Sequence, residues 1–191
     1  MSGSYLTNPI VFLVHTLFGL YVAVVMIRFL LQWVRADFYN PVSQFVVRLT
    51  TPVLRPLRGF IPGWAGLDLA ALVLAWLLKT AELALVALVV GLERNPLGAF
   101  AWAIPQLVVL LINIFLFAVL IRVILSWINP DPYHPAARVL DALTAPLLRP
   151  AQRLLPPIGG LDLSPILVMI ALVVLEMLLI PPLKLLTASP F

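Results

Sequence analysis

Ionisable side chains inside long apolar segments are the residues of this sequence that could do chemistry. Glu82 and Glu176 lie near the middle of such segments, and Lys79 precedes Glu82 by three residues. Residues three apart share one face of a helix, so Lys79 and Glu82 are expected to neutralise each other. Glu176 has no such cation, because Val173 stands at the corresponding position. Burial of an unpaired carboxyl disfavours its charged form. The candidate polar site of Lys79, Glu82 and Glu176 is therefore either a proton or cation site or a protonated acid bonded to a neighbouring helix.

Two arginine–aspartate pairs form a second candidate constellation. Arg28 and Arg122 lie about 9 Å inside the ends of apolar segments, at 1.5 Å per residue. Asp68 and Asp162 stand where the following apolar segments begin. An arginine side chain can extend that far toward a polar boundary. We expect a structural clasp in each pair, Arg28 with Asp68 and Arg122 with Asp162, in preference to a substrate-binding role.

Patterns typical of catalysis and cofactor binding are missing from the sequence. It contains no cysteine, which excludes disulfides, thiolate nucleophiles and Cys-bound metals. His15 and His134 are expected at different depths and without a third ligand. The sequence has no Gly-rich phosphate loop and no nucleophile elbow. We expect no enzyme activity, no cofactor and no metal.

The elements that position these residues are membrane spans. Of the 191 residues, 63% are apolar and only 10% are charged, whereas a soluble domain has about 25% charged residues. A helix needs about 20 apolar residues to cross the hydrocarbon layer. The net charge of +4 comes from scattered arginines, which suit anionic lipid headgroups better than nucleic acid. The sequence predicts an all-α membrane protein with four transmembrane helices, at roughly 10–34, 68–91, 104–128 and 163–184.

The chain is a tandem duplication with an offset of 94 residues. Trp33 falls on Trp127, Leu54-Arg55-Pro56 falls on Leu148-Arg149-Pro150, and Gly66-Leu67-Asp68-Leu69 repeats as Gly160-Leu161-Asp162-Leu163. Each copy contains a span, a polar proline-rich segment and a second span. The predicted domains are therefore two repeats, 1–94 and 95–191. Because two spans return the chain to its starting side, both copies should face the same way.

The distribution of arginine orients the spans. Seven arginines lie in the segments 35–67 and 129–161, whereas the connection at roughly 92–103 contains only Arg94. Cytoplasmic loops carry the excess of Lys and Arg. We expect both proline-rich segments to be cytoplasmic and both termini to lie on the outer side of the membrane.

Each proline-rich segment predicts a short amphipathic helix. Asn40 and Pro41 suit an N-cap and a first helical position, and apolar residues follow at i, i+3, i+4 and i+7. The second copy keeps this stripe after His134, which is expected to cap it. Pro52 and Pro146 should end these helices after about ten residues, too short to span, so we expect them to lie in the membrane interface.

Two interpretations of the proline-rich segments remain open. Either they are stiff hinges that position the spans, or they form a cytoplasmic surface for lipid or a partner protein. The candidate contact residues for the second interpretation are Phe45, Arg48, Arg55, Arg58, Val139, Arg149 and Arg153.

Three motifs resemble the YggT family, also called YlmG-like. They are D-F-Y-N-P-V-S-Q-F-V at 37–46, T-x-P-x-L-R-P-x-R-x-x-I-P after it, and G-G-L-D-L-S-P at 159–165. The resemblance covers nearly the whole chain. It implies an integral protein of bacterial cytoplasmic membranes with relatives in chloroplasts. It also implies links to osmotic stress tolerance, cell division and cytochrome assembly, but no agreed activity or catalytic residues.

Two functions remain open from the sequence. The first is a non-enzymatic scaffold or assembly factor whose interfacial helices engage anionic lipids or membrane, division or assembly proteins. The second is an ion channel or transporter in osmotic homeostasis, with Lys79, Glu82 and Glu176 along its path. Four spans make a poor pore alone, so the second function requires a homo-oligomer.

Overall fold

Six α-helices make up most of the structure, a computed structural model that describes residues 3–64, 66–92, 96–128, 134–155 and 162–191. Within these ranges the fold is all-α, as predicted. The boundary between the predicted repeats, Arg94 and the Gly160-Leu161 part of the repeated motif lie outside the described residues. The elements are α1 (Gly3–Trp33), α2 (Pro41–Phe60), α3 (Leu69–Val90), the 3₁₀ turn η1 (Pro96–Gly98), α4 (Ala99–Ile128), α5 (Pro135–Leu154) and α6 (Ser164–Thr187).

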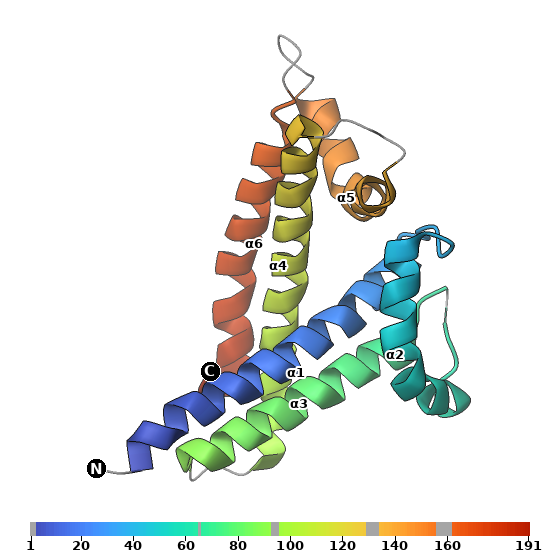
Figure 1. The fold of residues 1–191 in the computed structure, drawn as a ribbon. Coiled ribbons are helices and arrows are strands. Elements are labelled where there is room, and N and C mark those ends of the chain that lie inside the picture. Colours follow the sequence, from blue (N-terminus) through green and yellow to red (C-terminus); the bar gives the residue numbers. More distant parts are fainter. Residues whose placement is uncertain (1–2, 65, 93–95, 129–133, 156–161) are drawn as a thin grey trace.

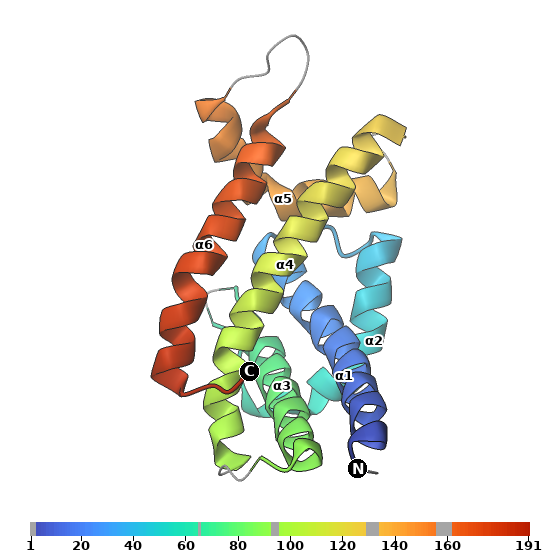
Figure 2. The same ribbon diagram turned by 90° about the vertical axis from the view of Figure 1, so that its left-hand side faces the viewer.

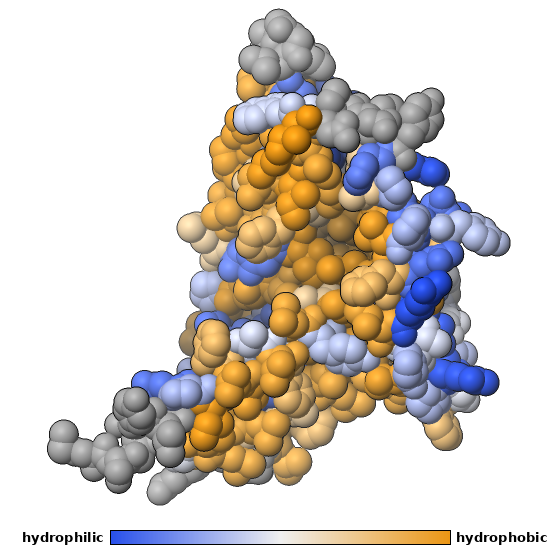
Figure 3. Space-filling model, in the orientation of Figure 1, coloured by the Kyte–Doolittle hydropathy of each residue, from blue (hydrophilic) through white to orange (hydrophobic). Residues whose placement is uncertain are grey.

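The helices α1, α3, α4 and α6 are long and apolar enough to cross a membrane, and they match the four predicted spans. Apolar side chains cover their outer surfaces, whereas hydrophilic ones gather on the side of α2 and α5 (Figure 3). The helix α6 is the least enclosed span, since only 11% of its most apolar window is buried inside the molecule. Helices with such surfaces are stable in hydrocarbon, where all their backbone groups are paired. The fold is that of a multi-pass membrane protein.

The spans are arranged as two antiparallel pairs. The helix α1 packs along α3, α4 packs along α6, and the two pairs are inclined to each other (Figures 1 and 2). The start of α1, the ends of α3 and α6 and the start of α4 lie toward the same end of the molecule, which we call the terminal end (Figure 1). The helices α2 and α5 lie at the opposite ends of the two pairs, which we call the elbow end. The core between the pairs is apolar and includes Leu30, Ala71, Leu74, Ile112, Phe115, Val119 and Val168.

The helices α2 and α5 are longer than the sequence predicts. Each has 20 residues and contains two prolines in its interior besides the one at its start, so the expectation that Pro52 and Pro146 end them is wrong. In the turn before Pro52 and in the turn before Pro146, a threonine hydroxyl donates to the carbonyl four residues earlier. The distance is 2.7 Å from Thr50 and 2.8 Å from Thr144. Such bonds hold the turn together and bend it. Each helix therefore changes direction at its prolines instead of ending (Figure 1).

Polar residues at helix starts fix where the candidate residues lie. Asn40 Oδ1 accepts a hydrogen bond from the Val42 amide at 2.9 Å, and Asp68 Oδ1 accepts one from the Ala71 amide at 3.3 Å. Asn40 is thus the expected N-cap of α2, and Asp68 is the N-cap of α3. His134 precedes α5 but makes no side-chain cap bond, so the capping role expected for it is wrong.

The helix α1 ends in a strained turn. Arg35 has φ +53°, in the left-handed region, and the Ala36 amide donates to the Leu31 carbonyl at 2.8 Å. Helices commonly end this way, but with glycine at the left-handed position, because a Cβ atom crowds the backbone there. The turn directs the chain from α1 into α2.

Candidate functional site

Arg28 of α1 is buried between α2 and α3. Its exposed fraction is 6%, and its Nη1 donates to Thr50 Oγ1 at 3.0 Å and to the Val47 carbonyl at 3.3 Å. Its Nε lies 3.8 Å from Asp68 Oδ2, close enough for an ion pair but not for a hydrogen bond. Arg58 of α2 donates directly to the same carboxylate oxygen. The expected pair is therefore present, and Arg58 extends it into a network that joins α1, α2 and α3.

The second repeat forms a different pair. Arg122 Nε lies 2.5 Å from Asp141 Oδ1 of α5, so the ion pair of Arg122 is with Asp141, and Arg122 acts on Asp162, its expected partner, only as a nearby charge. Asp141 stands where the first repeat has Val47, whose carbonyl Arg28 contacts. Both arginines thus reach the same turn of the proline-rich helix, but only the second finds a carboxylate there.

The contact between Arg58 and Asp68 in the first repeat has a counterpart at Asp162 in the second repeat. It accepts hydrogen bonds from Gln152 Nε2 and from the Ser164 amide, both at 2.9 Å. Gln152 corresponds to Arg58 and Asp162 to Asp68, so a neutral donor replaces a cation. Burial alone raises the pKa of Asp162, but the hydrogen bonds from Ser164 and Gln152 and the nearby charge of Arg122 outweigh burial and hold this pKa below its usual value.

Glu82 of α3 is completely buried and has two close partners. Its Oε1 lies 2.7 Å from Lys79 Nζ and 2.6 Å from Nδ1 of His15 on α1. Its Oε2 is buried and lacks a hydrogen-bond partner among the described residues. The His15 side chain is 43% exposed, so the cluster extends to the outer surface of the α1–α3 pair. The expected Lys79–Glu82 contact is present, and His15 is a partner that sequence reasoning missed.

The register of α1 against α3 could have predicted the contact between His15 and Glu82. Nearly as many residues separate His15 from Arg28 on α1 as separate Glu82 from Asp68 on α3. In an antiparallel pair of helices with equal rise per residue, placing Arg28 beside Asp68 also places His15 beside Glu82.

Glu176 of α6 does not join this cluster. It is half-buried and makes no hydrogen bond or ion pair within the part of the chain that the structure describes. Valines stand at the two positions that correspond to His15 and Lys79. The candidate polar site is thus divided, with Lys79 and Glu82 together and Glu176 apart. No three His, Asp or Glu side chains among the described residues are grouped as a metal ion would require.

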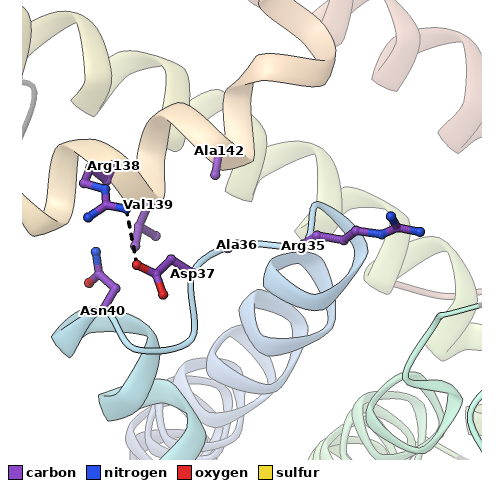
Figure 4. Close-up of a pocket in the computed structure, with 7 residues that line it drawn as sticks. All are labelled: Arg35, Ala36, Asp37, Asn40, Arg138, Val139 and Ala142. Carbon is purple, nitrogen blue, oxygen red and sulfur yellow. Dashed lines mark hydrogen bonds and ion pairs between the residues drawn. The ribbon is translucent and has the colours of Figure 1, made fainter.

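The proline-rich helices α2 and α5 meet near their N-terminal ends (Figure 4). Asn40 Nδ2 donates to the Pro135 carbonyl at 2.8 Å, and Arg138 Nη2 lies 3.3 Å from Asp37 Oδ2. These contacts border a cavity of about 160 Å³. Arg35 also lines the cavity, but its guanidinium points away from the other side chains (Figure 4). The junction joins the two repeats at the elbow end.

Val139 belongs to this junction and not to the outer surface. It is 8% exposed, so the expected lipid or partner contact at Val139 is wrong. The reason is that α5 turns its apolar stripe toward the rest of the molecule, where Val139 packs in a cluster with Leu31, Ala36 and Val46.

The other candidate contact residues lie on the surface. Phe45 is 62% exposed, and further exposed apolar residues of α2 are Val42, Leu49, Val53 and Phe60. The arginines Arg48, Arg55 and Arg58 of α2 and Arg149 and Arg153 of α5 are also exposed. Apolar residues of α5 up to Leu148 are buried or half-buried apart from its prolines, so α5 presents a mainly polar surface.

Comparison with known proteins places this architecture in a family. The sequence pattern of the CCB3/YggT family matches residues 7–89 and 101–183, once in each repeat. A relative from Pseudomonas aeruginosa, uncharacterized protein PA0392, is 44% identical over 190 residues, which cover 97% of this chain and 95% of the relative. Uncharacterized protein YggT of Escherichia coli K12 is 38% identical over 172 residues, which cover 89% of this chain and 88% of the relative. No solved structure matches the chain. With both repeats matched and relatives of this similarity along nearly its full length, the chain belongs to the CCB3/YggT family.

Proposed function

We propose that this protein is a non-enzymatic scaffold or assembly factor of the bacterial inner membrane. In this proposal α2 lies in the cytoplasmic interface on anionic lipid headgroups, and the elbow end contacts partner membrane, division or assembly proteins. The observation that carries the proposal is the outer surface of α2, which combines exposed apolar side chains with exposed arginines.

The helix α2 has three faces. One face is buried against the protein through Val46, Thr50 and Leu54. Helical spacing places a second, exposed apolar face beside it and a third face with the arginines beyond. An apolar stripe next to a cationic one is typical of a helix that lies in the plane of the interface. The exposed apolar face consists of Val42, Phe45, Leu49, Val53 and Phe60.

The charge of α2 supports anionic lipid as its contact. Each arginine near a negatively charged leaflet contributes about 1 kcal/mol of attraction. Arg48 and Arg55 of α2 are exposed, whereas the exposed Arg58 is already paired with Asp68. The excess of Lys and Arg marks the cytoplasmic side of a membrane protein. This supports a cytoplasmic elbow end, with both termini in the periplasm.

The polar surface of α5 supports a protein partner beside the lipid contact. Arg149 and Arg153 are exposed there, but α5 lacks an exposed apolar stripe like that of α2 within its described residues. A helix without such a stripe gains little from entering hydrocarbon. In this proposal α2 anchors the elbow end, and α5 remains accessible to other proteins.

Spin labels can test the placement of α2. The chain has no cysteine, so Val53→Cys provides a single labelling site on the apolar face. In bilayers that contain anionic lipid, we expect the label to be more accessible to oxygen than to a water-soluble nickel reagent. The double variant Phe45→Asp/Phe60→Asp should reverse this ratio without changing helix content. A label at Arg149→Cys, on α5, should remain accessible to nickel in both proteins.

Two results would contradict the proposal. A Val53→Cys label that favours nickel in the otherwise native protein would place α2 in water. Cross-linking in native membranes that captures only copies of this chain, together with measured ion flux after reconstitution, would contradict the scaffold role.

A second candidate function is an oligomeric ion channel or transporter. The observation that favours it is the completely buried Glu82, with Lys79 and His15 beside it inside a span. Charged groups at membrane depth often mark ion or proton paths. Purified protein in vesicles should then give a flux that Glu82→Gln abolishes. Absence of flux with protons, sodium and potassium would exclude this second candidate.

A further inference from the structure

Glu176 occupies the centre of the least enclosed span. It lies about 17 Å from the end of α6 at Thr187, at 1.5 Å per residue. Its side chain is half-buried and has no polar partner among the described residues. A carboxyl group at this depth is costly unless another group bonds to it. The missing bond calls for a hydrogen-bonding group from outside this chain.

His15 provides an exposed polar group at a comparable distance along its own helix. It lies about 18 Å from the start of α1 at Gly3, at 1.5 Å per residue. The start of α1 and the end of α6 both belong to the terminal end of the molecule (Figure 1). The exposed fraction of the His15 side chain is 43%. His15 and Glu176 therefore lie on different helix pairs at similar distances from the same end.

The two side chains are chemically complementary. The carboxylate of Glu82 accepts hydrogen bonds, so Nδ1 of His15, at 2.6 Å, donates to it. In the neutral imidazole this leaves Nε2 as an acceptor. A protonated Glu176 carries the O–H donor that this nitrogen needs. Lys79 already balances the charge of Glu82, so the completed chain of bonds is electrically neutral.

We propose that two copies of this chain form a symmetric dimer in the membrane, in which the Glu176 carboxyl of each copy donates to Nε2 of the partner subunit's His15. The helix α6 of one copy then packs along α1 of the other. Figure 2 shows both helices on the face turned to the viewer. A two-fold axis between them creates the contact twice. The dimer gives Glu176 its missing partner and covers the least enclosed span.

Counting subunits in bilayers tests the dimer. Fluorescently labelled protein is reconstituted at increasing protein-to-lipid ratios, and photobleaching steps give the dimer fraction. Glu176→Leu and His15→Leu should each weaken dimerisation about tenfold, since each change removes two interhelical hydrogen bonds per dimer. Glu176→Gln keeps an N–H donor and should retain most of the affinity. Met177→Leu, an exposed neighbour of Glu176, is the matched control and should have no effect.

Disulfide cross-linking tests the geometry. Thr16 and Met177 are exposed neighbours of the two residues, and the chain has no native cysteine. The double variant Thr16→Cys/Met177→Cys should oxidise to covalent dimers and to no larger species, because both disulfides close within one symmetric pair. Thr16→Cys/Leu185→Cys, whose cysteines differ in depth, should cross-link much less.

Several results would overturn the dimer. They are a monomer at every lipid ratio, a tenfold loss with Met177→Leu, equal affinity of Glu176→Leu and the native chain, a ladder of cross-linked species, or cross-linking by Met177→Cys alone. The inference is independent of the lipid contact of α2, because Phe45→Asp/Phe60→Asp should leave the dimer fraction unchanged.

Discussion

In the first repeat Arg28 and Asp68 are buried, whereas their counterparts in the second repeat, Arg122 and Asp162, are half-buried and exposed. The same contrast holds deeper in the spans. Glu82 is enclosed by a lysine and a histidine, but Glu176 has valines at both corresponding positions. The two copies follow similar backbone paths and hold their polar groups differently.

The amphipathic helices show the opposite trend. In the first repeat the apolar stripe of α2 is largely exposed, whereas the stripe of α5 packs inside the molecule. The first repeat thus combines buried polar networks with an apolar outer helix, and the second combines buried apolar contacts with exposed polar groups. The comparison indicates that the duplicated prolines within α2 and α5 give both copies a bent helix, while side-chain partners at a few positions decide what each copy can do.

The largest difference between the repeats should appear when the two aspartates are replaced. Asp68→Leu leaves the buried Arg28 without its counter-charge, and we expect it to lower the free energy of unfolding by about 3–5 kcal/mol. Asp162→Leu should cost far less, because exposed polar contacts are screened by solvent. Unfolding in mixed micelles, followed by circular dichroism, measures both. Equal losses would show that the burial difference has no energetic consequence.

The next largest effect is expected when Lys79 is replaced by valine, the residue at the corresponding position of the second repeat. Lys79→Val leaves the buried Glu82 without a cation, and we expect a loss of about 2 kcal/mol in the same unfolding assay. Adding Glu82→Leu should recover most of the loss, because no carboxyl then remains unpaired. A double variant as unstable as Lys79→Val would contradict a charge effect and indicate lost packing.

A gain in stability is expected at the end of α1. Arg35→Gly removes the Cβ atom from a left-handed residue and should raise the free energy of unfolding by about 1 kcal/mol. Arg35→Ala keeps the Cβ atom and serves as the control, with no gain expected. A stabilising alanine variant would indicate that the arginine charge, and not backbone strain, limits stability.

The smallest effect concerns pH. Because the pKa of Asp162 is lowered in the folded protein, its contribution to stability is present above the ordinary aspartate pKa of about 3.9 and is lost as the pH falls through the lowered value. The melting temperature of the native chain should exceed that of Asp162→Asn at pH 6, and the gap should narrow as the pH falls below about 4. A difference in melting temperature that widens on acidification would show that folding raises the pKa of Asp162 instead of lowering it.

The sequence predicts those features that depend on local patterns. The lengths of the apolar segments predict the four spans, and residues beside helix starts, such as Asn40 and Asp68, predict the caps. The Lys79–Glu82 contact follows from spacing within one helix. In each case the residues that interact are close in the chain.

Features that depend on tertiary packing were missed. His15 meets Glu82 only through the register of α1 against α3, and Arg122 meets Asp141 only because α5 turns that residue toward α4. The helix α2 passes through Pro52 because threonine hydroxyls bond within the bend. Val139 is buried because this part of α5 packs against α1 and α2. An apolar stripe in the sequence does not show whether it packs against a neighbouring helix or against lipid.

The elbow-end junction formed by the Asn40–Pro135 and Asp37–Arg138 contacts would be too small by itself to hold two folded units together, although the apolar core between the helix pairs also joins the repeats. Two separate proteins would need a much larger contact to stay together at cellular dilution. Here a peptide connection fuses the units, which raises the concentration of one in the vicinity of the other to the millimolar range. After fusion of the ancestral copies, the two repeats no longer needed a large contact at the elbow end. Their polar residues could then diverge.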